Sequence, residues 1–127
     1  MSAVPDAHQI RLAGPWQTKV ESGSRERRQL PFCAAGDNAA LTVYRSFNGS
    51  EGILAAPTVR IRIQFEGSEP SVQLNQQVIT TWIETGNAGH LEFDVAHIIQ
   101  KSNSLMLTCC HQSGDRITDV CLLVFDE

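Results

Sequence analysis

Apolar and polar side chains alternate with a period of two through most of this chain. In residues 59–66, Val59, Ile61, Ile63 and Phe65 alternate with polar neighbours. Such alternation is typical of a β-strand with one buried face and one solvated face. The pattern, together with apolar runs, predicts eight or nine short strands. They cover residues 9–12, 16–21, 41–47, 59–66, 72–75, 78–83, 91–95, 105–110 and 120–125.

The remaining segments fit an all-β fold. Residues 105–110 and 120–125 are apolar at nearly every position, which predicts central strands covered on both faces. Turn-forming Gly, Pro, Asn and Asp residues lie between the strands. One segment, 95–101, predicts a short helical turn with Asp94 as its cap. Many short strands with regular turns predict an antiparallel sandwich or jelly roll.

Length and charge exclude several classes of protein. The 127 residues predict one domain over 1–127, too short for a catalytic barrel of about 250 residues. The net charge of −4 does not favour nucleic acid or anionic lipid as partners. The basic run 25–28 contains an acidic residue and predicts an exposed strand or loop edge. No leader and no membrane-spanning apolar run is visible, so we expect no membrane partner.

The cysteines predict neither disulfides nor a metal site. Cys33, Cys109, Cys110 and Cys121 lack the Cys-x-x-Cys spacing typical of zinc ligands. Cys109 and Cys110 are adjacent, and neighbours on a strand point to opposite faces. We expect free thiols that act as small buried hydrophobes in a reducing, cytoplasmic compartment. No cofactor is expected.

Three segments carry a family resemblance in their order and spacing. Residues 43–47 (VYRSF) match a Tyr-Arg-x-x-Phe strand, and residues 59–75 (VRIRIQFEGSEPSVQLN) match a strand ending Phe-Glu-Gly, a loop, and a strand ending in Asn. Residues 93–107 (FDVAHIIQKSNSLML) match a Phe-Asp-Ile-Thr-x-Leu-Leu turn followed by Asn-x-Leu. Together they resemble the sugar-binding domain of glycoside hydrolase family 2, the group of β-galactosidases and β-glucuronidases. Gly14-Pro15-Trp16 is similar to that domain's opening.

The resemblance implies a galactose-binding-like jelly-roll sandwich. In that fold, Asn75 would supply side-chain hydrogen bonds at a tight hairpin, and Ile98 would close one end of the sandwich. The chain departs from the family at Gln76, where glycine is usual, and at residues 80–90, which replace a Gly-Gly-Tyr-containing stretch. The family's catalytic barrel is not part of these residues, so the resemblance implies no glycosidase activity.

The stretch 82–90 has the composition of a sugar-binding loop. Trp82 offers an aromatic face, and Glu84, Asn87 and His90 offer groups that bond hydroxyls. These four residues are the predicted ligand site. The alternative is that Trp82 ends a core strand and the rest is a solvated loop, because the chain has few other aromatic residues to fill its core. Trp16 is predicted to lie in the core.

No catalytic constellation emerges from the sequence. Glu92 and Asp94 share a strand face, but a solvated face with a helix cap explains them without catalysis. Cys109 and His111 share another face, yet an apolar strand favours an inert thiol. We therefore predict a non-catalytic carbohydrate-binding module whose partner is a carbohydrate or a glycosidase-like protein. The alternative is a protein-interaction or structural sandwich that binds no sugar.

Overall fold

A computed structural model of the chain describes residues 8–12, 16–18, 27–28, 32–33, 41–80, 83, 89–109 and 114–125. Over this part of the chain there are eleven strands and one short helix. Their bounds are β1 His8–Arg11, β2 Trp16–Thr18, β3 Arg27–Arg28, β4 Phe32–Cys33, β5 Leu41–Asn48, α1 Glu51–Ala55, β6 Thr58–Glu66, β7 Ser71–Leu74, β8 Gln77–Ile79, β9 His90–Asp94, β10 Ser102–Cys109 and β11 Arg116–Phe125.

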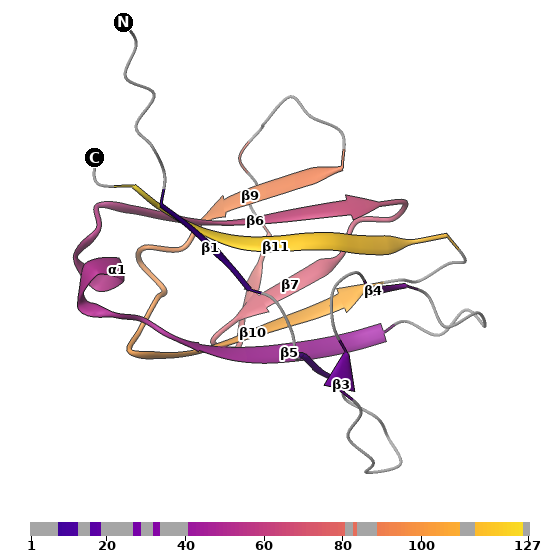
Figure 1. The fold of residues 1–127 in the computed structure, drawn as a ribbon, viewed down its shortest axis with the longest axis horizontal. Coiled ribbons are helices and arrows are strands. Elements are labelled where there is room, and N and C mark those ends of the chain that lie inside the picture. The colour runs from indigo at the N-terminus through magenta and orange to yellow at the C-terminus, as the bar shows by residue number, and fades with distance from the viewer. Residues whose placement is uncertain are drawn as a thin grey trace, which may run out of the picture.

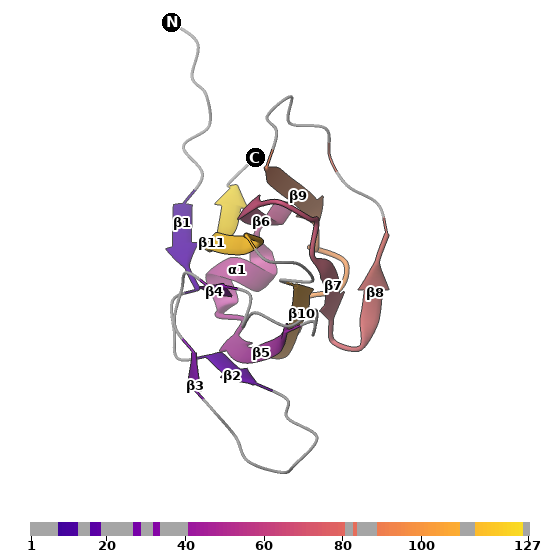
Figure 2. The same ribbon diagram turned by 90° about the vertical axis from the view of Figure 1, so that its right-hand side faces the viewer.

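The strands form two antiparallel sheets that lie face to face (Figure 1). One sheet has the order β1-β11-β6-β9, with β4 also paired to β11, and the other has the order β3-β2-β5-β10-β7-β8. Figure 2 shows β8 and β9 on one side of the sandwich, with β1 and β3 on the opposite side. The predicted all-β antiparallel sandwich is confirmed.

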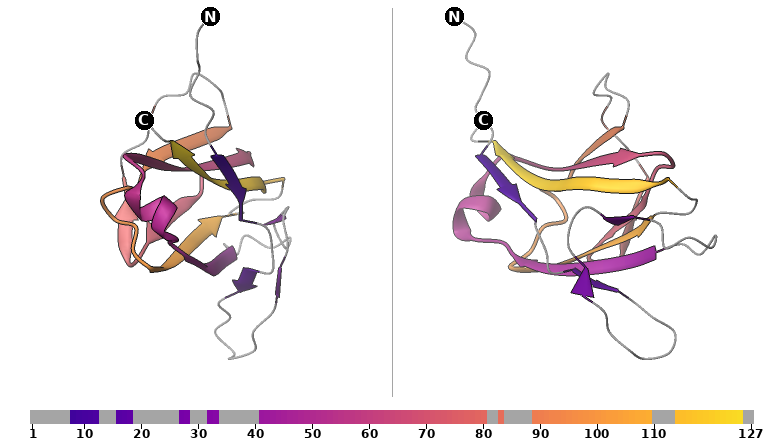
Figure 3. Two further views of the ribbon diagram at one scale, coloured as in Figure 1. Left: turned by 60° about the vertical axis from the view of Figure 1, so that its left-hand side comes forward. Right: turned by 45° about the vertical axis from the view of Figure 1, so that its right-hand side comes forward.

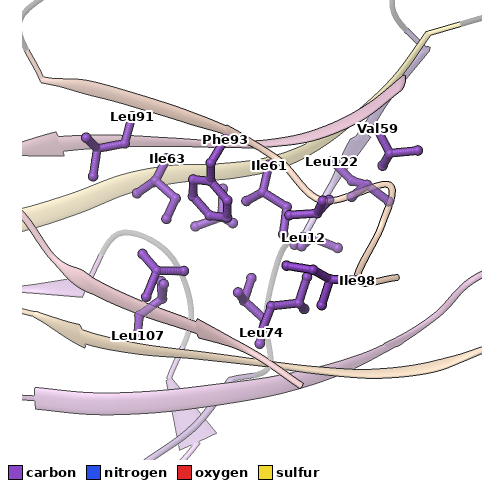
Figure 4. Close-up of a cluster of buried hydrophobic side chains, with 14 of the residues drawn as sticks. Leu12, Val59, Ile61, Ile63, Leu74, Leu91, Phe93, Ile98, Leu107 and Leu122 are labelled. Atoms are coloured by element: carbon purple, nitrogen blue, oxygen red, sulfur yellow. The ribbon is translucent and has the colours of Figure 1, made fainter. Parts of the chain in front are cut away.

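The inward faces of both sheets supply the core, as the period-two pattern predicts. Val59, Ile61 and Ile63 of β6 are fully buried, and Leu105 and Leu107 of β10 face them from the other sheet. Figure 4 shows apolar side chains from both sheets pointing into the shared interior. At about 25 cal/mol per Å² of apolar surface removed from water, this interior is the main source of stability.

Trp16 is also buried, as predicted, and its indole Nε1 donates to the Leu12 carbonyl over 2.9 Å. That bond satisfies the one polar atom of the ring inside the core.

The two segments predicted to be central strands occupy central positions. β10 lies between β5 and β7, and β11 lies between β1 and β6. Residues 120–124 of β11 are all buried, which confirms cover on both faces. In β10, Met106 and Thr108 are only half-buried, so full cover of both faces is wrong for this strand.

The number and the ends of the strands differ from the prediction. β3 and β4 have two residues each, too few for an alternating pattern to be visible. β3 forms an edge of the six-stranded sheet, which confirms the strand edge predicted over residues 25–28 for its described part, 27–28. β8 ends at Ile79, and Ile83 instead bridges to Glu92 of the other sheet.

The predicted helical turn at 95–101 is confirmed over residues 95–99 and does not extend to residue 101. The Val95 carbonyl accepts from the amides of both Ile98 and Ile99 at 2.9 Å, which makes an isolated turn. The next amide, that of Gln100, donates to the Asn103 side chain at 2.8 Å instead of continuing a helix. Ile98 is buried, as the resemblance implied.

The cap role predicted for Asp94 is replaced by an ion pair. Its carboxylate accepts from Arg60 Nε at 3.3 Å, and no cap bond to the turn is found among the described residues.

The helix that does form, α1, lies at one end of the sandwich between β5 and β6 (Figure 3). Ser50 caps it by accepting from the Ile53 amide at 3.4 Å, and Ile53 is buried. An exposed glycine, Gly52, lies in this helix, and a Cβ there would meet no atom within 4 Å.

Another glycine lies at the opposite end of the sheets, where the β6–β7 connection packs closely against the residue before β11. Gly67, after β6, has φ +87, and an added Cβ would overlap Oδ1 of Asp115 and lie 3.0 Å from its Cγ. Asp115 is buried, and the same Oδ1 accepts from the Ser68 amide at 3.0 Å. A side chain at position 67 would therefore separate the β6–β7 connection from the start of β11.

The two glycines make a matched pair for a stability test. We expect Gly67→Ala to lower the free energy of unfolding by about 2–4 kcal/mol, through steric overlap and a disfavoured φ. Gly52→Ala should raise it by up to about 1 kcal/mol, since alanine is the better helix former. Urea denaturation measures both, and an unchanged stability in Gly67→Ala would contradict the assigned contact.

Candidate functional site

The predicted ligand loop is described only at its end. Trp82, Glu84 and Asn87 lie outside the residues that the structure describes, so their predicted role stays a prediction. His90 is the first residue of β9, is half-buried and pairs with Gln64 of β6. His90 thus belongs to the five-stranded sheet.

A small hollow lies where the two sheets come together on the β8–β9 side. Its volume is about 180 Å³. One wall is β8 and the residue after it, and the other is the end of β9 with the turn that follows. The lining residues are Gln77, Val78, Ile79, Thr80, Asp94, His97 and Ile98. In the sequence, the β8 wall ends two residues before the predicted loop begins at Trp82.

The β7–β8 hairpin sets the position of the first wall. Its two loop residues, Asn75 and Gln76, have φ values of 52 and 70. Two consecutive positive φ values are typical of a type I′ turn, whose twist matches that of paired strands. This tight turn places Val78 on the edge strand of its sheet, where 62% of it is exposed.

The Asn75 side chain fixes that hairpin to the second wall. Its Nδ2 donates to the Ile98 carbonyl at 3.2 Å and to Oδ1 of Asn103 at 2.9 Å. Its Oδ1 accepts from the Ser104 amide at 2.9 Å. The hairpin bonds implied for Asn75 by the resemblance are therefore present, and they also hold the 95–98 turn.

Asn103 completes this arrangement from the start of β10. It is only 3% exposed, and its Oδ1 accepts from the Gln100 amide as well as from Asn75. Its Nδ2 donates to the carbonyls of Gln100 at 2.7 Å and Phe47 at 3.4 Å. Each amide atom of the buried Asn103 thus has partners, which avoids the cost of an unsatisfied polar group. We call the side chains of Asn75 and Asn103 the amide hub.

The lining of the hollow combines polar and apolar groups. Gln77, Thr80 and His97 are exposed and present an amide, a hydroxyl and an imidazole. Asp94 adds a carboxylate, and Val78 adds an exposed apolar surface. These groups can bond the hydroxyls of a small polar ligand while Val78 contacts its C–H face.

A second hollow, of about 360 Å³, lies beside the amide hub. It is lined by Ser46, Asn75, Gln76, Gln100, Ser102, Asn103 and Ser104. The side-chain amides of Asn75 and Asn103 already bond the fold, so they are committed elsewhere. We therefore favour the first hollow as the candidate site.

The two carboxylates of β9, those of Glu92 and Asp94, form ion pairs with one arginine. Arg60 lies 3.3 Å from Asp94 through Nε and 3.8 Å from Glu92 through a terminal nitrogen. The Arg60 guanidinium also lies over the Phe125 ring, 5.3 Å from its centroid. Glu92 and Asp94 thus share one cation on the outer face of the sheet, which fits the solvated strand face predicted for them.

Two further observations concern the described residues alone. Among them, no group of three or more His, Cys, Asp or Glu side chains could hold a metal ion. Nor does any helix in that part of the chain have the length and apolar character to cross a membrane.

Sequence reasoning missed most of this hollow. Its two walls, 77–80 and 94–98, are separated along the chain and meet only through the hairpin and the turn. Two signals could have pointed to it. Val78 sits among polar residues in a short strand, and Asp94 and His97 are three positions apart at a strand end.

Comparison with known proteins supports the fold alone. No family model matches the chain, and no curated protein matches it. Among solved structures, an FMN-binding β-glucuronidase from Facaelibacterium prausnitzii L2-6 matches with a TM-score of 0.69 and 16% sequence identity. The match covers 92% of this chain but only 22% of the glucuronidase chain. The chain is thus similar in fold to a part of that enzyme.

Cys121 is the cysteine whose environment the structure describes. It is free and buried on the outer face of β11, and its Sγ donates to Oδ2 of Asp119 at 3.4 Å. Burial raises the pKa of the Cys121 thiol, and the neighbouring Asp119 carboxylate raises it further. A raised pKa keeps the thiol protonated and unreactive. The prediction of a free, buried thiol is confirmed at this position.

We expect iodoacetamide to alkylate Cys121 far more slowly in the native protein than in the unfolded chain, as mapped by mass spectrometry. Asp119→Asn should speed the native reaction, because loss of the negative charge lowers the pKa of the thiol. The stabilisation from the protonated thiol is full below its ordinary pKa and is lost as pH rises through the raised one. Equal rates in native and unfolded protein would contradict the described burial.

Proposed function

We propose that the protein is a non-catalytic carbohydrate-binding module and that the hollow between β8 and the 95–98 turn is its sugar site. The observation that carries the proposal is the lining itself, which combines residues bearing an amide, a hydroxyl, a carboxylate and an imidazole with an exposed valine. Sugars present hydroxyls around a ring with apolar C–H patches, and this set of side chains complements both features.

The size of the hollow supports a small ligand. Its volume of about 180 Å³ is below the roughly 300–1,000 Å³ typical of pockets for drug-sized molecules. It suits one sugar ring at the end of a chain. An open site of this size, with half-exposed walls, gives weak binding, in the millimolar range, since few atoms of the ligand are removed from water.

The similarity of fold is consistent with a carbohydrate role. The glucuronidase acts on a sugar derivative by name, and this chain shares the fold of about a fifth of it. Binding without turnover is supported by the carboxylates nearest the hollow. Glycoside hydrolysis needs a carboxyl pair held about 5–10 Å apart across the scissile bond. Asp94 and Glu92 instead share Arg60 on one strand face.

A protein-interaction module is the second candidate, and one observation favours it. Val78 is 62% exposed on β8, an edge strand of the six-stranded sheet. The backbone N–H and C=O groups of an edge strand can pair with another chain, and an exposed apolar side chain there can pack against it. A partner seated there would cover the same hollow, so the two functions compete for one surface.

Titration of ¹⁵N-labelled protein with methyl β-D-glucopyranoside tests the sugar site. We expect shifts at the amides of Val78, Thr80 and His97, with saturation at millimolar sugar. Gln77→Ala should weaken binding by about two- to tenfold through loss of one hydrogen bond. Gln73→Ala is the matched control, because Gln73 lies on β7 outside the hollow, and it should bind like the wild type.

Two results would contradict the proposal. One is the absence of shifts at high millimolar sugar, and the other is a set of shifts confined to residues outside the hollow. Self-association that depends on Val78, detected by light scattering together with no sugar response, would support the interaction module instead.

A further inference from the structure

The charges at the hollow are unevenly distributed. Asp94 is the carboxylate of the described lining, and its side chain is 54% exposed. Glu92 lies two residues earlier on the same strand face, and Arg60 contacts both carboxylates. Asp94 is therefore the acidic residue of the described lining, and its counter-charge, Arg60, lies on β6 outside that lining.

Arg60 is held in place by its three contacts. It bonds Asp94, lies near Glu92 and covers the Phe125 ring. An anionic ligand in the hollow would have to compete for a cation already committed on the outer face of the sheet. None of the lining residues that the structure describes is lysine or arginine.

The next cation along β6 is farther away. Arg62 pairs in register with Glu92, whereas Arg60 pairs with Asp94. Two residues along a strand correspond to about 6–7 Å, so Arg62 does little to neutralise Asp94. Arg62 also interacts with the thiol of Cys121 on the neighbouring strand.

We propose that the hollow selects neutral and amino sugars and discriminates against uronic acids. This inference rests on the proposed sugar site and names its ligand class. The Asp94 carboxylate accepts hydrogen bonds from hydroxyls and, more strongly, from an ammonium group. A sugar carboxylate would instead place a like charge near Asp94 in a partly desolvated space, which is unfavourable.

If the ligand were inferred from the structural neighbour, a uronic acid would be expected, which is the opposite of the charge preference proposed here. That neighbour is a β-glucuronidase, an enzyme named for a uronic acid. The side chains at this hollow, and not the shared fold, determine which charge is accepted.

Three ligands that share one ring test the inference: methyl β-D-glucopyranoside, its 2-amino-2-deoxy derivative and the corresponding glucuronide. Each is titrated into ¹⁵N-labelled protein at pH 7, where most of the amine is protonated and the carboxylate is ionised. We expect the amino sugar to bind at least about threefold more tightly than the glucuronide, with the neutral sugar between them. High salt should reduce the differences among the three affinities, because dissolved ions screen the charge of Asp94.

Two variants test whether the charge of Asp94, and not the shape of its side chain, determines which sugar binds more tightly. Asp94→Asn should bring the three affinities to within about twofold of one another. Glu69→Gln is the matched control, because Glu69 is exposed in the β6–β7 connection and does not line the hollow, and it should keep the wild-type order. If Asp94→Asn does not fold, the same charge effect is tested by the salt dependence of the affinity differences in the wild-type protein.

The outcomes distinguish this inference from the proposed function. If the glucuronide binds through the same amides at least as tightly as the amino sugar, the charge selection is overturned and the sugar site stands. If none of the three sugars shifts the hollow's amides, the sugar site itself is refuted, and the selection with it. An affinity order that survives both high salt and Asp94→Asn also overturns the inference.

Discussion

One hydrogen bond between two asparagine side chains connects the parts of this sandwich that matter for its candidate site. Nδ2 of Asn75 donates to Oδ1 of Asn103 at 2.9 Å, and each side chain also bonds the main chain of other segments. Through these bonds the hub ties the β7–β8 hairpin, the 95–100 turn and the end of β5 together. A net contribution of about 1 kcal/mol for each such bond makes the hub a large share of local stability.

The site depends on the hub because its walls come from different sheets. β8 is an edge of the six-stranded sheet, and Asp94 ends an edge strand of the other. In the described hydrogen-bond pattern, the Asn75 side chain links the β7–β8 hairpin to the 95–98 turn through the Ile98 carbonyl. A polar contact therefore connects the hairpin and the turn that form the walls of the candidate site, while the apolar core supplies most of the stability.

The sequence predicts what depends on local patterns and misses what depends on distant partners. Alternation in residues 59–66 correctly indicates β6 and its buried face, because a strand's period is a property of neighbouring residues. The helical turn predicted at 95–101 ends earlier than expected because Asn103, outside the segment, accepts from the Gln100 amide. The hollow was not predicted because neither segment 77–80 nor segment 94–98 has a distinctive composition. The two segments form a hollow only when the fold places them side by side. The predicted Trp82 site is not tested, since that residue lies outside the described part of the chain.

Hydrogen exchange in Asn75→Gly tests the central role of the hub most directly. Glycine accepts the positive φ at this position, so the substitution removes the side-chain amide and leaves the turn geometry available. The account predicts exchange at least about tenfold faster at the amides of Ile98, Ile99 and Gln100, with unchanged protection where β6 pairs with β11. Unchanged protection in the turn, or equal loss across both sheets, would contradict it.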